Sequence, residues 1–301
     1  MSREQGIVAA NFGRQVLVEN AEGALIPCIM SGRKLRPVTG DRVMWEPLDG
    51  KNKGLVCEVL PRDNELTRPD RRGRTDVLAA NVSQVMVVCA PRPTPDLFLI
   101  DRYLAAAAFM GASASVVLNK SDLENEAGLE PLREALVEYS KIGYPVIHTS
   151  AMSMEGLAPL CAQMVGHTSI LVGQSGVGKS SILNALLPEA DILTGELSEA
   201  SGEGRHTTTA SRLYHLNTGG ELIDSPGVRD YAPAAFGEAD LTNGFIEFAE
   251  PAGSCKFANC RHLHEPHCGV TQAVEDGVIC PRRYESYKRL TRLMEQLRPG
   301  Y

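Results

Sequence analysis

No part of this 301-residue sequence combines the length and the apolar content of a membrane-spanning helix. The most apolar helical stretch, residues 103–119, contains glycine and serine and is better interpreted as a helix, a turn and a strand. The first residues, MSREQGIVAA, lack the basic start and the long apolar run of a secretory signal peptide. We therefore expect a cytoplasmic protein without membrane contacts.

Positive charge is not in excess either, because 37 Asp and Glu outnumber 30 Lys and Arg and give a net charge of −7. This balance argues against a surface uniformly adapted to nucleic acid. Two segments are locally basic, RPDRRGR at 68–74 and the stretch 282–298. Charge alone favours a solvated linker and a solvated helix face for them. The composition, 43% hydrophobic and 22% charged, is typical of a globular protein, and the length allows two or three domains.

The eight cysteines do not indicate a disulfide framework. Cys28, Cys57, Cys89 and Cys161 are scattered among apolar neighbours and are expected to be small buried hydrophobic residues. The other four are crowded into the last quarter of the chain beside histidines, a pattern that favours metal binding.

The crowded segment has the spacing C-x4-C-x-H-x5-C. Three thiolates and an imidazole suit a tetrahedral zinc ion, and a complete set of protein ligands leaves no open position for catalysis. We expect one structural zinc ion, with His264, His267 and Cys280 as alternative ligands. The expected ligands are Cys255, Cys260, His262 and Cys268.

The distribution of strand-like and helix-like segments predicts a central α/β domain, preceded by a β domain and followed by a small helical domain. Residues 1–68 alternate short strand-like runs with glycine turns, which favours an OB-type β-barrel. Residues 69–76 are interpreted as an arginine-rich linker. Residues 77–233 alternate strands and helices, which predicts a mostly parallel sheet with helices on both faces. Residues 234–301 hold the cysteine-rich segment and a basic helix.

GQSGVGKS at 173–180 follows a strand and precedes a helix, which is the context of a phosphate-binding loop. In such a loop, glycines let backbone N–H groups face the phosphates, and the helix N-terminus adds partial positive charge. Lys179 is expected to reach the outer phosphates, and the Ser180 hydroxyl to ligate Mg²⁺.

NKSD at 119–122 follows an earlier strand. The Asp122 carboxylate can accept two hydrogen bonds from guanine, whereas adenine would leave that charge unpaired. The segment 149–151 would supply a backbone N–H to the guanine oxygen, so GTP is favoured over ATP. The predicted nucleotide-binding residues are Asn119, Lys120, Ser121, Asp122, Ser150, Ala151, Gly173, Gln174, Ser175, Gly176, Val177, Gly178, Lys179, Ser180 and Ser181.

Two further elements follow the phosphate loop. GEGRHTTT at 202–209 is a polar loop suited to a first switch, in which Thr208 or a neighbouring threonine would ligate Mg²⁺. In DSPG at 224–227, Asp224 would hold Mg²⁺ through water and the Gly227 N–H would lie near the γ-phosphate. The order is therefore base, base, phosphate, switch, switch, a circular permutation that packed domains tolerate.

Together these motifs resemble the circularly permuted bacterial GTPases called ribosome small-subunit-dependent GTPase A, over essentially the whole chain. The resemblance implies binding of GTP and GDP, hydrolysis stimulated by the 30S subunit, a role in its late maturation, and contact with its 16S rRNA. We expect a monomer whose RNA contacts are shared by the barrel and the two basic segments, including Arg71, Arg72, Arg282 and Arg283. The alternative is a non-catalytic zinc- and RNA-binding adaptor that uses GTP as a structural ligand.

After DSPG, Val228 stands where Ras-like enzymes place a water-orienting glutamine, so slow intrinsic turnover is expected. His206 in the first-switch loop is the nearest candidate in sequence for that role. A contact of His206 with RNA or with its own loop is nearly as well supported.

Overall fold

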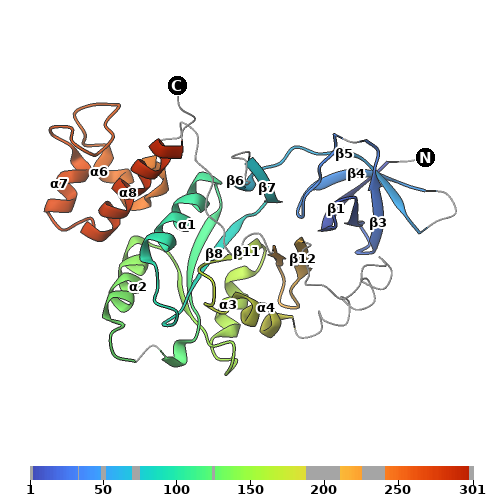
Figure 1. Cartoon of the computed structure of the whole chain (residues 1–301), viewed down its shortest axis with the longest axis horizontal. Coiled ribbons are helices and arrows are strands. Elements are labelled where there is room, and N and C mark those ends of the chain that lie inside the picture. Colours follow the sequence, from blue (N-terminus) through green and yellow to red (C-terminus); the bar gives the residue numbers. More distant parts are fainter. Residues whose placement is uncertain are drawn as a thin grey trace.

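The computed structural model shows an elongated molecule with three parts in chain order: a barrel, a central sheet covered by helices, and a helical C-terminal unit (Figure 1). The described residues are 3–32, 34–48, 52–69, 75–123, 126–187, 211–225 and 241–297. Among the helices in these ranges, none is long and apolar enough to cross a membrane.

The N-terminal part is a five-stranded barrel, as the sequence predicts. It closes because β1 pairs with both β2 and β4, while β3 runs parallel to β5. Alternating inward residues, among them Val18, Val43 and Trp45, fill its core. The strands are β1 (Glu4–Asn11), β2 (Gln15–Glu19), β3 (Leu25–Met30), β4 (Arg42–Pro47) and β5 (Gly54–Val59).

The segment 69–76, expected to be a linker, belongs at both ends to β-strands. Strands β6 (Glu65–Pro69) and β7 (Thr75–Ala80) pair antiparallel, with Arg68 opposite Asp76. The ends of 69–76 therefore belong to a hairpin whose buried residues, such as Leu66, pack on the central core. The arginine-rich composition hid the alternation that makes these flanking residues strands.

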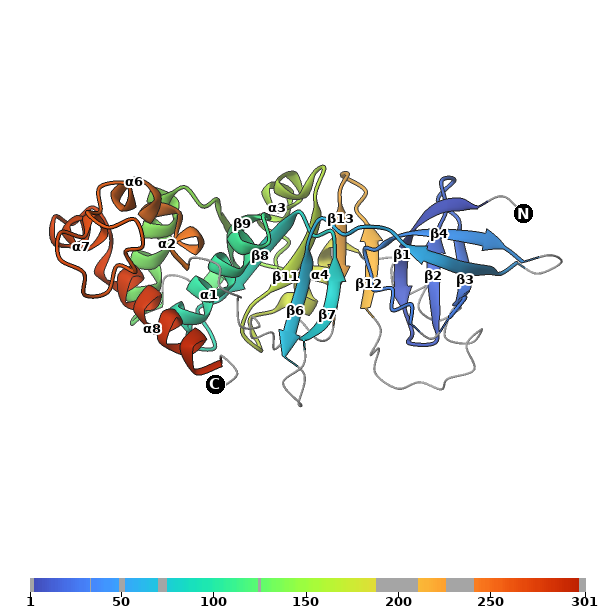
Figure 2. The same ribbon diagram turned by 90° about the horizontal axis from the view of Figure 1, so that it is seen from above.

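The central sheet has the strand order β10-β9-β8-β11-β13-β12, parallel except for β12 (Figure 2). Two separate apolar cores cover its faces, one including α1 and α2 and the other including α3 and α4. The strands are β8 (Gln84–Cys89), β9 (Ser113–Leu118), β10 (Val146–His148), β11 (Thr168–Val172), β12 (Ser211–His215) and β13 (Glu221–Asp224). The helices are α1 (Leu97–Phe109), α2 (Glu130–Ile142), α3 (Leu157–Met164) and α4 (Lys179–Leu186).

The barrel and the central sheet share hydrogen bonds, which the sequence did not indicate. Strand β1 pairs antiparallel with β12, so that Asn11 lies opposite Ser211 and Ala10 opposite Arg212. An eleven-stranded sheet therefore runs continuously through both parts.

The C-terminal unit consists of several short helices and the longer α8, packed around Phe245, Phe248 and Tyr287. It contains two 3-10 helices, η3 (Leu241–Gly244) and η4 (Ile246–Phe248), and the α-helices α6 (Ala249–Ala252), α7 (Gly269–Glu275) and α8 (Pro281–Leu297).

A buried ionic cluster joins α8 to the central part. Arg283, fully buried, donates to Asp101 of α1 at 2.8 Å and to both carboxylate oxygens of Glu247 at 2.7 and 3.0 Å. Arg282 donates to the other oxygen of Asp101 at 2.7 Å, and Tyr139 also donates to Asp101. The prediction that Arg283 contacts RNA is therefore wrong, because its side chain is fully buried in this interface. The Arg282 side chain is 28% exposed and is paired with Asp101, so its contact with RNA stays a prediction.

Candidate nucleotide site and metal centre

The loops that carry the nucleotide motifs lie at one edge of the central sheet. Because β9, β10, β11 and β13 are parallel, their carboxyl ends meet there. Asn119 follows β9, Thr149 follows β10, Gly173 follows β11 and Ser225 follows β13. Motifs that are far apart and rotated in sequence thus become neighbours.

The phosphate loop requires its glycines. Gly173 has φ +144°, and a Cβ there would lie 2.1 Å from the Val88 carbonyl oxygen. Gly178 has φ +94°, and a Cβ there would lie 2.2 Å from Nδ2 of Asn119. Lys179, mostly buried, donates from Nζ to the carbonyl oxygens of Gly173 and Gln174 at 2.7 and 2.8 Å. The ammonium group is thereby held within the loop.

Asn119 connects the phosphate loop to the loop after β10. Its buried side chain donates to the Val177 carbonyl at 2.8 Å and accepts from the Ala151 N–H at 3.2 Å. Lys120, with φ +58°, donates to the carbonyl oxygens of Gly176 and Arg92 at 2.8 and 2.9 Å. The Arg92 contact was not predicted, because the proline-rich segment after β8 matches no motif.

The segment predicted to read the base includes a short 3-10 helix, η1 (Ser121–Leu123), in which Asp122 is exposed. The Ser121 N–H donates to the Thr149 carbonyl at 3.1 Å, which ties this turn to the loop after β10. The Ser150 N–H donates to the Glu155 carbonyl oxygen at 2.9 Å. The Ala151 N–H donates instead to a side chain, the Asn119 amide oxygen, at 3.2 Å.

The predicted magnesium end of the site is described in part. Ser180 and Asp224 line one pocket together with Lys179 and Ser225. A hydroxyl and a carboxylate are oxygen ligands of the type that Mg²⁺ takes in proteins. Ser175 and Ser181 lie within or beside the same loop and helix start. Thr208, His206 and Gly227 fall outside the described residues.

The four predicted metal ligands come together in the C-terminal unit. Their ligand atoms all lie within 4.8 Å of one another. Nδ1 of His262 is 3.4 Å from the sulfurs of both Cys255 and Cys268, which are 3.9 Å apart. The remaining ligand of the group is Cys260, whereas His264, His267 and Cys280 do not belong to it.

Backbone N–H groups surround the thiols. Gly269 donates to the Cys255 sulfur at 3.3 Å, and Thr271 donates to the Cys268 sulfur at 3.5 Å at the start of α7. Burial by itself raises the pKa of Cys268, but hydrogen bonds from Thr271, the Cys260 thiol and the Val270 N–H outweigh it and lower that pKa. Burial raises the pKa of Cys260 to about 12.

Sequence reasoning missed Glu265, which shapes the metal loop. Its carboxylate accepts N–H bonds from Arg261, Leu263 and His264 at 3.0 to 3.1 Å. Burial by itself raises the pKa of Glu265, but these N–H bonds outweigh it and bring the pKa down to about 2. A single glutamate between histidines carries no signal of that role.

Comparison with known proteins decides the family. A model of the RsgA GTPase family matches residues 59–233. The small ribosomal subunit biogenesis GTPase RsgA of Alcanivorax borkumensis is 45% identical over 295 residues, covering 96% of this chain and 84% of that protein. The protein of that name from Pseudomonas savastanoi is 44% identical, covering 97% and 86%. This chain belongs to the RsgA GTPase family.

Solved structures agree with this placement in the RsgA family. The crystal structure of YjeQ from Thermotoga maritima superposes with a TM-score of 0.79 at 34% identity and covers both chains completely. That of YloQ, described as a circularly permuted GTPase, gives a TM-score of 0.77 at 30% identity, covering 100% of this chain and 98% of that one. The permuted GTPase fold and the GTPase activity predicted from the motif order are thereby confirmed, and the non-catalytic adaptor is excluded.

Proposed function

We propose that this GTPase acts as a switch in late maturation of the small ribosomal subunit. Its relatives are named small ribosomal subunit biogenesis GTPases, which supports a role in the assembly of that subunit. The observation that carries the proposal is the convergence of the rotated motif loops at one sheet edge, with Asn119 bonded to both the phosphate loop and the Ala151 loop. Small ribosomal subunits would stimulate hydrolysis that is slow in the free protein. The cytoplasm would be the place of action, and the acting form a monomer.

In the proposed site, GTP lies across the loops after β9, β10 and β11. Asp122 accepts hydrogen bonds from the guanine N–H groups. The Ala151 N–H, which lies 3.2 Å from the Asn119 amide oxygen, donates to the guanine oxygen. The backbone of 173–178 and Lys179 bind the phosphates, with Ser181 at the helix start. A base without two N–H donors would leave the negative charge of Asp122 without hydrogen-bond donors and would bind much more weakly.

Mg²⁺ would be held by Ser180, by Asp224 and by Thr208, and when bound it neutralises charge on the transferred phosphoryl group. The Gly227 N–H would face the γ-phosphate, and His206 would orient the attacking water. The assignments of Thr208, Gly227 and His206 rest on sequence alone, since these residues lie outside the described ranges.

The four-ligand group is proposed to hold structural zinc. Bonds of about 2.3 Å to sulfur and about 2.0 Å to nitrogen in a tetrahedron place ligand atoms roughly 3.5 to 3.8 Å apart. The 3.4 and 3.9 Å separations around Cys255, His262 and Cys268 fit that requirement. Zinc would connect the loop that follows α6 to Cys268, the residue directly before α7, and so hold α6 and α7 together.

RNA contact is proposed for the barrel and for the outer face of α8. OB-type barrels bind oligonucleotides on one face. Arg283 is buried and Arg282 is half-buried and paired with Asp101, so the exposed arginines of α8 in the described part of the chain are Arg289 and Arg292. We further propose that residues 1–68, 77–233 and 234–301 act as the RNA-binding, GTPase and zinc-binding domains.

Guanine selection is tested by Asp122→Asn. An amide donates one hydrogen bond where the carboxylate accepts, so we expect GTP affinity to fall at least about tenfold and xanthosine triphosphate to bind better. Glu134→Gln, an equally exposed change on α2, serves as the control and should leave both affinities unchanged. Unaltered GTP affinity in Asp122→Asn would remove the assignment.

RNA contact is tested by co-sedimentation with small ribosomal subunits over a salt series. Reversing the charge of Arg289 and Arg292 should weaken association and reduce its salt dependence, because fewer counterions are released. A salt slope identical to that of the unchanged protein would exclude this face of α8.

A further inference from the structure

We propose that Thr39, a residue of the barrel, positions Asp224 for Mg²⁺, acting through strand β12. The barrel would then be part of the scaffold of the GTPase site as well as a separate binding module. This inference rests on the proposed Mg²⁺ role of Asp224.

The first step is the contact between the barrel and β12. Thr39 is fully buried, and its hydroxyl donates to the Ser211 carbonyl at 3.0 Å. Beside this bond, Asn11 and Ala10 of β1 lie opposite Ser211 and Arg212. The barrel therefore covers the edge of β12 that would otherwise end the central sheet.

The second step leads from β12 to Asp224. Arg212 is the register partner of Asp224 in the antiparallel pair of β12 and β13, and the Ser211 hydroxyl lies 3.5 Å from the Asp224 carbonyl oxygen. Only one strand separates the barrel from the residue that ends β13 at the nucleotide edge. A shift of Ser211 would therefore change the position of Asp224.

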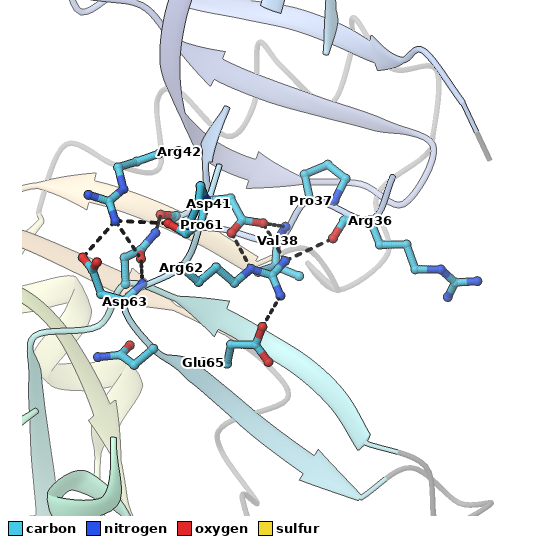
Figure 3. A network of polar contacts seen from close by, with 12 residues as sticks. Arg36, Pro37, Val38, Asp41, Arg42, Pro61, Arg62, Asp63 and Glu65 are labelled. Atoms are coloured by element: carbon cyan, nitrogen blue, oxygen red, sulfur yellow. Dashed lines mark hydrogen bonds and ion pairs between the residues drawn. The ribbon is translucent and has the colours of Figure 1, made fainter. Parts of the chain in front are cut away.

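The third step is the rigidity of the loop that carries Thr39. Asp41, fully buried, accepts from the Val38 N–H at 2.7 Å and from two nitrogens of Arg62 at 2.7 and 2.8 Å (Figure 3). The Thr39 carbonyl accepts from the Ala80 N–H at 3.0 Å. At Gly40 the backbone passes so close that a Cβ would lie 2.2 Å from the Ala80 carbonyl oxygen. Thr39 is thus held from both sides and can act as a fixed point.

The Arg212 side chain adds a second contact across the same joint. Its guanidinium lies 5.6 Å from the ring centroid of Phe12, which follows β1, and Arg212 is mostly buried. Phe12 is 44% exposed, so this cation–π contact has the modest strength of a surface pair. The start of β12 is therefore held by the barrel through both backbone and side chain.

Mg²⁺ is the ligand most sensitive to such positioning, because it demands nearly ideal octahedral geometry. Without the Thr39 hydroxyl, the Ser211 carbonyl loses a buried donor and the end of β12 can move with Asp224. Mg²⁺ affinity should then fall, while nucleotide contacts made without Mg²⁺ stay intact.

The test compares Thr39→Val, which keeps the shape, with Thr39→Ser, which keeps the hydroxyl. The readout is the Mg²⁺ concentration that slows release of a fluorescent GDP by half of its full effect. We expect Thr39→Val to raise it about two- to fivefold, up to the worth of one ordinary hydrogen bond, and Thr39→Ser to leave it unchanged. Release in EDTA should be equal in all variants.

Thr168→Val is the matched control, since its hydroxyl donates to Glu221 at 2.6 Å, at the end of β13 far from Asp224. It should leave the Mg²⁺ requirement unchanged. Fluorescence of Trp45, the single tryptophan and a core residue of the barrel, verifies that each variant is folded. If Thr39→Val disturbs the barrel, Ser211→Ala removes the next link and should raise the Mg²⁺ requirement in the same direction.

Asp224→Ala separates the two hypotheses. If it leaves the Mg²⁺ requirement unchanged, the proposed role of Asp224 is wrong. If it raises the requirement while neither Thr39→Val nor Ser211→Ala does, Asp224 keeps its role and the positioning by Thr39 is refuted.

Discussion

At the scale of single residues, Asn119 and Gly178 explain why motifs that are separate in sequence act together. Both were predicted as nucleotide-site residues, but the sequence does not indicate that one packs on the other. The Asn119 side chain occupies the space that a Cβ of residue 178 would need. That contact depends on the parallel arrangement of β9 and β11 around β8, which no local pattern encodes.

Gly178→Ala should therefore lower GDP affinity by about tenfold or more, because it displaces Asn119 in addition to straining the backbone. Gly219→Ala is a matched control: its φ of +93° equals that of Gly178 within a degree, yet its Cβ would have no neighbour closer than 3.8 Å. We expect Gly219→Ala to cost stability alone, with GDP affinity unchanged. Fluorescent GDP titration and thermal unfolding measure the two effects, and equal affinities in both variants would contradict the packing argument.

Arg283 marks where residue-level prediction failed. A run of basic residues in a helix does not reveal which of them faces inward, and the partner Asp101 is 182 positions away. The aromatic ring of Phe245, 4.6 Å from its guanidinium, completes an enclosure that charge counting cannot foresee.

Asp101→Asn should destabilise the protein by about 3 kcal/mol, because it removes one of the two carboxylates that compensate the buried Arg283 charge and leaves Glu247 as the remaining one. Urea unfolding measures this loss. Glu130→Gln breaks an exposed ion pair with Arg133 and should cost less than about 0.5 kcal/mol. A loss in Asp101→Asn no larger than in the control would show that the cluster does not stabilise the interface.

At the scale of elements, the metal loop was the most predictable part of the chain. Its ligands lie within fourteen positions of one another, so their spacing reports geometry directly. Strand β12 is the opposite case: its pairing with β1 joins residues some 200 positions apart, and strand alternation alone does not name a partner. The barrel topology was predicted, but its attachment was not.

Metal removal should change which thiols react. In the metal-bound protein, Cys28 and Cys89 are buried with pKa values raised by burial to about 12, so neither should be alkylated at pH 8. A chelator should release about one zinc per chain and expose three further thiols, those of Cys255, Cys260 and Cys268, as the folding energy of the loop is lost with the metal. Mass spectrometry of alkylated peptides counts them, and an unchanged pattern after chelation would exclude the metal site.

At the scale of the whole molecule, buried polar contacts fix both neighbours of the GTPase part. The hydrogen bond from Thr39 to Ser211 joins the barrel side, and the ion pair of Arg283 with Asp101 joins the C-terminal side. Among the described elements, β13 is the last one of the GTPase part, and its last residue is Asp224. Both outer parts are thus attached to strands or helices that border the nucleotide edge, an arrangement suited to reporting nucleotide state to a large partner.

The central claim, a GTPase switched by the small ribosomal subunit, is tested most directly by GTP turnover of the full chain with and without purified small subunits. We expect slow hydrolysis by the free protein, acceleration of at least about tenfold by small subunits, and no acceleration by large subunits. Equal turnover with and without small subunits, or equal acceleration by large ones, would contradict it.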